Sequence, residues 1–144
     1  MANKSNKNSN QISQKILVPL ASLPAVLLPW YDREKRSLPW RDIVTPYRTW
    51  VSEIMLQQTR VQAVLPYFER FMAAAPDVPA LAELAEDRLL SLWQGLGYYS
   101  RARSLQRSAR VMVDQYGGCL PDTYSDLIQL PGIGDYTAGA ILSI

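Results

Sequence analysis

The chain has 144 residues and a formal charge of +2 at neutral pH, and 48% of its residues are hydrophobic. This length suits one domain or a piece of a larger one, and the hydrophobic content is enough for a buried core. So small a charge excludes a general polycation, so nucleic-acid contacts would need local clustering of charge. The sequence has no histidine and a single cysteine, Cys119. Ser-His-Asp and Cys-His catalysis, an all-Cys/His metal site and an internal disulfide are therefore excluded within this chain.

The N-terminal residues divide into a polar tract, MANKSNKNSNQ, and an apolar tract, ILVPLASLPAVLLPW. The polar tract predicts disorder, and we assign residues 1–22 to a disordered or poorly ordered tail. The apolar tract is too short to span a membrane and contains Pro19, Pro24 and Pro29. It loosely resembles the apolar region of a signal peptide, but we expect it to lead into the first helix of the fold.

Helical patterns follow one another from Pro24 onward, and no run alternates with period two over a strand's length. Thr45 and Pro46 predict the N-cap and first turn of a helix. Its apolar stripe is formed by Tyr47, Trp50, Val51 and Ile54. A second helical pattern covers residues 61–72, where Pro66 predicts a kink or a fresh start.

The second half of the chain continues the helical pattern. Residues 81–97 predict one or two short helices that end at Gly95 or Gly97. Residues 100–118 predict another helix, with an inward face formed by Leu105, Ala109, Met112 and Tyr116. Thr123 with Asp126 predicts a capping box. A last helix begins near Asp135 and is still apolar at Ile144, so we predict an all-α protein truncated within a helix.

The sequence LPGIGDYTAGAI, residues 130–141, places the turn Pro131-Gly132-Ile133-Gly134 between two predicted helices. Glycines there permit tight or positive-φ backbone and leave room for a phosphate. Amides of the turn and of the next helix N-terminus can hold a phosphate oxygen. The pattern is typical of a helix-hairpin-helix element, here about residues 123–144, which binds DNA without reading its sequence. The alternative is a helix–helix turn without a ligand.

Two further patterns are each open to two interpretations. In GLGYYSRARSLQRSAR, residues 95–110, four arginines follow a pair of tyrosines. The arginines can form a phosphate track beside a base-contacting loop. Alternatively, they form a solvated helix face and the two tyrosines lie in the core. In SEIMLQQTR, residues 52–60, Glu53 lies at the boundary of the apolar face, where a carboxylate can line a cleft or point at water. Gln57, Gln58 and Thr59 then either reach base edges or form a polar helix end.

Together, LPWR…TPYRTWVSEIMLQQTRVQAVLPYFERF, LWQGLGYYSRAR and LPGIGDYTAGAILS resemble adenine DNA glycosylases of the MutY type. These belong to the helix-hairpin-helix superfamily that includes endonuclease III. The resemblance runs from about Trp30 to the last residue, and it implies a helix-hairpin-helix DNA glycosylase fold for residues 23–144. It also implies removal of adenine mispaired with 8-oxoguanine or guanine in double-stranded DNA. We expect a monomeric, cytoplasmic, bacterial-type protein that associates with the nucleoid through DNA and not with membranes.

The resemblance also implies residue roles. Glu53 matches the catalytic glutamate that protonates adenine, a task for which a carboxyl needs a raised pKa. Tyr136 stands where bifunctional relatives carry a Schiff-base lysine, so the chain resembles a monofunctional glycosylase. Trp40 and Arg41 match the adenine pocket. The implied DNA contacts are Gln57, Gln58, Thr59, Leu96, Tyr98, Arg101, Gly132, Ile133, Gly134 and Thr137.

The chain departs from these relatives beyond the hairpin. Their essential aspartate, four cysteines holding a 4Fe-4S cluster and a domain recognising 8-oxoguanine all follow that point. Asp135 is the only acid after the hairpin begins, and it cannot be assigned the aspartate's role. We therefore expect no cofactor or metal within this chain, and interpret it as an incomplete N-terminal fragment. The alternatives are a thymine DNA glycosylase for G·T mismatches and a non-catalytic DNA-binding fragment.

Overall fold

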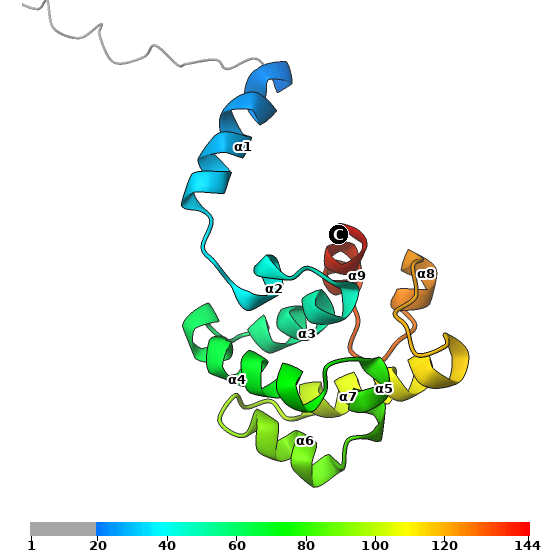
Figure 1. Ribbon diagram of the computed structural model, residues 1–144. Helices are drawn as coiled ribbons and strands as arrows, with labels where there is room; N and C mark the ends of the chain where they lie inside the picture. Colours follow the sequence, from blue (N-terminus) through cyan, green and yellow to red (C-terminus); the bar gives the residue numbers. More distant parts are fainter. Residues whose placement is uncertain (1–19) are drawn as a thin grey trace, which may run out of the picture. The chain divides into compact units, whose positions relative to one another are not determined.

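The computed structural model describes residues 20–144, and every regular element in this range is a helix, as predicted (Figure 1). The expectations for residues 1–19, including most of the predicted tail, lie outside the described residues. In chain order the elements are η1 (Leu20–Ser22), α1 (Leu23–Glu34), α2 (Pro39–Asp42), α3 (Pro46–Leu56), α4 (Val61–Ala74), α5 (Val78–Glu83), α6 (Glu86–Trp93), α7 (Ser100–Gln115), α8 (Tyr124–Leu127) and α9 (Asp135–Leu142).

The described residues divide into two units, of which the first ends at Arg36 and the second is Ser37–Ile144. In the first unit, α1 contains no buried residue. Its exposed large apolar side chains are Leu23, Val26, Leu27, Leu28, Trp30 and Tyr31. Within residues 20–144, no helix has both the length and the apolar character needed to cross a membrane. The assignment of residues 23–36 to the same domain as the later helices stays a prediction.

Helix α3 is the centre of the second unit and packs against α4, α7 and α9. It begins as predicted, because the Thr45 hydroxyl accepts a hydrogen bond from the Arg48 N–H at 3.1 Å and Pro46 occupies the first turn. The predicted apolar stripe is buried, and it consists of Tyr47, Trp50, Val51 and Ile54. Packing against several helices leaves α3 with few accessible side chains for a functional site.

Helices α4 to α6 form the next part of the core. Pro66 lies inside α4, which continues over Val61–Ala74, so of the kink or fresh start predicted there the fresh start is wrong. The segment 81–97 contains part of α5 and all of α6, and Gly95 and Gly97 follow α6 with φ of +103° and +75°. Positive φ is easily adopted only by glycine, which explains why the chain turns there. Phe71 of α4 packs edge-to-face on Trp93 of α6.

Helix α7 packs along α5 and also contacts α3 and α6. Of its predicted inward face, three residues are buried and Tyr116 is partly buried. The Thr123 hydroxyl caps α8 by accepting from the Asp126 N–H, which confirms the hydroxyl half of the predicted capping box. Helix α9 ends at Leu142, and Ser143 follows as its C-cap.

Candidate functional site

A cleft of about 450 Å³ opens between α2, α3 and α9, a volume typical of small-molecule sites, which span about 300–1000 Å³. Its lining brings together five of the predicted site residues, namely Trp40, Arg41, Glu53, Gln57 and Tyr136. They come from three elements that are distant in sequence, and the contacts of α3 with α2 and α9 unite them. The remaining lining residues are Val44, Thr49, Ser52, Leu56, Ala140, Ser143 and Ile144.

Glu53 is half-buried at the edge of α3, between the buried residues Ser52 and Ile54. Burial raises the pKa of the Glu53 carboxyl above its usual range. Within residues 20–144 this carboxyl forms no ion pair, and burial is the only cause of its pKa shift. Glu53 is also the only acidic side chain that lines the cleft within the described residues. A carboxyl in this setting can hold a proton closer to neutrality than an exposed glutamate and can act as a general acid.

The other predicted cleft residues differ in their exposure. Trp40 is buried, and its ring packs edge-to-face on Phe68 with centroids 5.0 Å apart and planes at 74°. Arg41 is exposed on the same short helix. Tyr136 lies in the first turn of α9 and is 80% exposed. The cleft therefore places a packed indole, a long exposed cationic side chain and an accessible phenol around the Glu53 carboxyl.

The glycine-rich turn between α8 and α9 is fastened to α7. Gly132 has φ of +77°, and an added Cβ would lie 2.9 Å from the Cβ of Ser104. The buried Ser108 hydroxyl donates to the Pro131 carbonyl at 2.7 Å. Gly132 and Gly134 are exposed, which leaves the main chain of the turn accessible. Close approach to α7 and left-handed backbone together explain the glycine at position 132.

Two predicted DNA contacts in this region, Ile133 and Thr137, have buried side chains, 5% and 3% exposed. Their side chains therefore support the hairpin from inside, and the accessible groups are those of the main chain. Tyr124 of α8 donates a hydrogen bond to the Asp135 carboxylate at 2.6 Å, and this bond raises the pKa of the Tyr124 phenol. Asp135 thus ties α8 to α9 and does not line the cleft.

Two loops, one that follows α3 and one that follows α6, contain the only non-glycine residues with positive φ in the described chain, Gln58 at +57° and Tyr98 at +50°. The α3–α4 loop also contains Thr59, whose hydroxyl donates to the Gln57 carbonyl at 3.3 Å. In the α6–α7 loop Tyr98 is 64% exposed, whereas the predicted contact Leu96 is buried. Strained backbone of this kind concentrates at functional sites.

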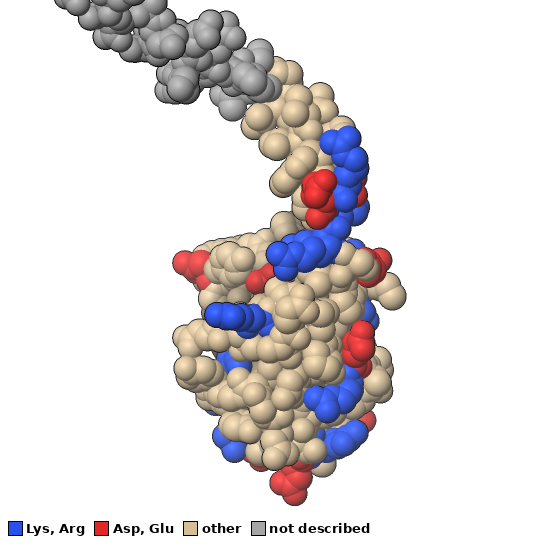
Figure 2. Space-filling view, turned by 90° about the vertical axis from the view of Figure 1, so that its left-hand side faces the viewer, with Lys and Arg blue, Asp and Glu red and all other residues tan. Residues whose placement is uncertain are grey.

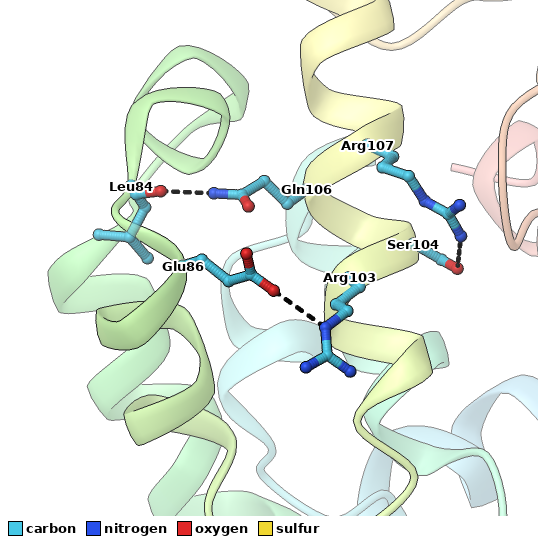
Figure 3. Close-up of polar contacts among 6 residues, drawn as sticks. All are labelled: Leu84, Glu86, Arg103, Ser104, Gln106 and Arg107. Carbon is cyan, nitrogen blue, oxygen red and sulfur yellow. Dashed lines mark hydrogen bonds and ion pairs between the residues drawn. The ribbon is translucent and has the colours of Figure 1, made fainter.

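The arginines of α7 are largely engaged within the protein (Figure 3). Arg103 pairs with Glu86 of α6 at 3.0 Å, and Arg107 donates to the Ser104 hydroxyl, while the buried Gln106 donates to the Leu84 carbonyl. Arg110 donates to a carbonyl of α5. The alternative with two core tyrosines is wrong, because Tyr98 and Tyr99 are both exposed.

Charge is not gathered into one basic patch on the face shown in Figure 2, where acidic side chains lie among the basic ones of the Ser37–Ile144 unit. No group of three or more histidine, cysteine, aspartate or glutamate side chains in residues 20–144 could hold a metal ion. An iron–sulfur cluster held by four thiolates does not fit this chain either, because its one cysteine, the exposed Cys119, supplies a single ligand.

Comparison with known proteins identifies the family to which the chain belongs. The family described as HhH-GPD superfamily base excision DNA repair protein matches residues 51–140, which include Glu53, both loops and the hairpin. The chain belongs to this superfamily. Adenine DNA glycosylase of Buchnera aphidicola subsp. Baizongia pistaciae is 46% identical over 118 residues, covering 81% of this chain and 34% of that protein. Adenine DNA glycosylase of Mus musculus is 50% identical over 127 residues, covering 82% of this chain and 25% of that protein.

Solved structures of the superfamily share the fold. A thermostable thymine-DNA glycosylase superposes with a TM-score of 0.75 at 25% identity, covering 85% of this chain and 57% of its own. A trapped endonuclease III–DNA covalent intermediate superposes with a TM-score of 0.70 at 19% identity, covering 83% and 55%. The chain spans between a quarter and about a third of the length of these curated relatives.

Several cleft residues were not anticipated from the sequence. Thr49 and Leu56 lie one helical turn from Glu53, and Ala140 lies one turn from Tyr136. The helical period, applied outward from Glu53 and Tyr136, predicts these neighbours. No comparable sequence pattern predicts Val44, Ser143 or Ile144, because they reach the cleft through tertiary packing.

Proposed function

We propose that the protein is a monofunctional adenine DNA glycosylase, which removes adenine mispaired with 8-oxoguanine or guanine from double-stranded DNA. The observation that carries the proposal is the Glu53 carboxyl, whose pKa is raised by burial in a cleft that it shares with Trp40, Arg41 and Tyr136. The 46–50% identity to adenine DNA glycosylases supports adenine as the base.

The proposed reaction begins with extrusion of the base. Adenine in a duplex is paired and stacked, so cleft residues reach it only after it has turned out of the helix. Glu53 then gives its proton to a ring nitrogen of adenine. The N-glycosidic bond breaks, its electron pair moves to the base, and a cation remains on the sugar. Water adds to that carbon and releases a proton, which leaves an abasic site.

The described residues provide no second carboxylate side chain to stabilise the sugar cation. Glycoside hydrolysis uses a second carboxylate beside the reacting carbon. In the described residues Glu53 is the only acidic side chain of the cleft, and the Asp135 carboxylate is bonded by Tyr124. We therefore assign base extrusion and protonation to this chain, and expect the second carboxylate to come from a further segment. We also place the 4Fe-4S cluster implied by the resemblance outside this chain.

Tyr136 supports hydrolysis without strand cleavage. A phenol cannot form the imine through which a lysine cuts the sugar–phosphate strand. Tyr136 is exposed and lines the cleft with Glu53, so a nucleophile at this position would face the reacting sugar. Borohydride is expected to trap no covalent complex between the protein and DNA, and a trapped adduct would reveal a lyase.

The test is single-turnover release of adenine from an A·8-oxoguanine duplex. We would compare this chain with a chimera in which it replaces the segment it matches in the Buchnera relative. The chimera is expected to release adenine, and Glu53→Gln to slow release by about 10²–10⁴-fold, the usual contribution of a general acid. Glu69→Gln, on the exposed face of α4, is the matched control and should leave the rate unchanged.

A chimera that is folded and binds the duplex but releases no adenine would refute the adenine assignment. The second candidate is a thymine DNA glycosylase for G·T mismatches, which the TM-score of 0.75 to a thymine-DNA glycosylase favours. Thymine release from a G·T duplex by the same chimera identifies it. A non-catalytic DNA-binding role predicts a steep salt dependence of duplex binding and no base release from either duplex.

A further inference from the structure

One side chain from outside both loops holds the two loops in which Gln58 and Tyr98 have left-handed backbone. The loops are residues 57–60, after α3, and residues 94–99, after α6. Arg101, in the first turn of α7, is half-buried, and its guanidinium lies between them. Its Nη1 lies 2.7–3.1 Å from three carbonyl oxygens at the end of α3, those of Ile54, Met55 and Gln57. Its Nη2 lies 3.4 and 3.1 Å from two carbonyl oxygens of the other loop, those of Leu96 and Gly97.

Two aromatic rings lie against the same guanidinium. It lies 5.3 Å from the ring centroid of the buried Trp93 and 5.6 Å from that of Tyr98. The Trp93 indole N–H donates in turn to the Gly97 carbonyl at 3.1 Å. Arg101 thus contacts the left-handed Tyr98 through its ring, and its Nη1 bonds the carbonyl next to the left-handed Gln58.

The end of α3 explains why a cation is needed. The last carbonyls of a helix have no partner within the helix, and they form the negative end of its dipole. The two N–H groups of the Arg101 Nη1 are shared among the Ile54, Met55 and Gln57 carbonyls. Of these, the Ile54 carbonyl also accepts from the Gln57 N–H at 3.4 Å. Left-handed backbone is unfavourable for Gln58 and Tyr98, and it persists only where the surroundings hold it.

We propose that Arg101 is a positioning residue that locks the α3–α4 and α6–α7 loops to each other, so that Gln58 and Tyr98 are ready to enter the DNA stack together. The proposal rests on the proposed base extrusion and revises the expected role of Arg101 as a phosphate contact. Its Nη donors point at protein carbonyls, which leaves them occupied before DNA arrives. Lysine cannot replace it, because one ammonium lacks the planar fork that spans two loops and stacks on rings.

Loop shape can be measured in the full 144-residue chain without DNA. The Thr59 N–H donates to the Leu56 carbonyl at 3.2 Å, and the Leu96 N–H donates to the Trp93 carbonyl at 3.0 Å. Hydrogen exchange at these two amides reports whether each loop keeps its turn. Both amides are expected to be protected in the unsubstituted chain, and exchange at the rate of an unstructured peptide would overturn the proposal without any variant.

Arg101→Lys is expected to speed exchange at both amides by about tenfold or more, because both loops lose carbonyl contacts together. The buried amides of α4 should keep their protection. Arg88→Lys, on the exposed face of α6, is the matched control and should change neither loop. Unchanged exchange in Arg101→Lys, or loosening of one loop alone, would refute the lock. In a Gln58→Asn background the effect on Thr59 should shrink, because asparagine adopts left-handed backbone more readily.

A second readout tests the consequence for DNA. A duplex with 2-aminopurine opposite 8-oxoguanine becomes more fluorescent when the base leaves the stack. At saturating protein, Arg101→Lys is expected to lose most of this increase while duplex affinity changes by less than about threefold, because loop positioning and phosphate binding are separate. Equal fluorescence in both proteins would contradict the role of Arg101 in extrusion. No increase with the unsubstituted chain would instead count against the proposed function, while the exchange data still decide the lock.

Discussion

Replacement of Gly132 by alanine is expected to destabilise the Ser37–Ile144 unit through two separate costs. The residue has φ of +77°, and alanine in left-handed backbone costs about 1–2 kcal/mol. The new Cβ would lie 2.9 Å from the Cβ of Ser104, which is anchored directly to the α7 backbone and cannot swing away. Forcing an extra methyl group into packed structure costs about 1–3 kcal/mol. The expected total is about 2–5 kcal/mol.

Two other glycines separate these costs. Gly117 has φ of +62° with open space around an added Cβ, so Gly117→Ala should carry the backbone cost alone, about 1–2 kcal/mol. Gly134 has φ of −100° and also open space, so Gly134→Ala should cost roughly nothing beyond ordinary surface effects of about 0.5 kcal/mol. The three variants therefore have a predicted order of stability that depends only on φ and on the contact with Ser104.

The assay is urea unfolding followed by tryptophan fluorescence and circular dichroism. For a slope of about 2 kcal/mol per molar urea, a loss of about 3 kcal/mol lowers the midpoint by about 1.5 M. Ser104→Gly removes the clashing Cβ, so in that background Gly132→Ala should cost no more than Gly117→Ala. An equal loss of stability in Gly132→Ala and Gly117→Ala in the unsubstituted chain, with no change on adding Ser104→Gly, would refute the clash with Ser104.

Three further outcomes are expected. The pKa of Glu53 is raised in the folded chain, so between the unfolded and folded pKa values the folded chain binds more protons than the unfolded chain. As pH rises through this window, the unsubstituted chain should therefore lose stability relative to Glu53→Gln. Urea midpoints of the two proteins that run parallel across pH would disprove this. Tyr47→Phe leaves the buried Ala75 carbonyl without its 2.7 Å hydrogen bond and should cost about 1–3 kcal/mol of unfolding free energy, so an unchanged urea midpoint would contradict it. Thr45→Ala removes the α3 cap and should cost about 1 kcal/mol, whereas Thr45→Ser should restore it.

Local sequence was sufficient for the start of α3 and for the edge of that helix on which the acid lies. The cap at Thr45 and the period of the apolar stripe together set the register of α3, and that register alone places Glu53 at the boundary of the buried face. The turn at Gly132 was equally predictable, since its backbone conformation is local. Neither inference requires knowledge of distant parts of the chain, because helix caps, periods and turns are encoded by neighbours.

Tertiary structure decided what surrounds those positions. Only the packing of α2 and α9 on α3 turns the edge with Glu53 into a cleft and raises the pKa of its carboxyl, because desolvation depends on atoms from remote segments. The same holds for Arg101, which the sequence presents as one of several arginines on α7. Its bonds to the end of α3 arise from packing between residues more than forty positions apart. Sequence periodicity specifies which side of a helix is buried, and the fold alone specifies what that side meets.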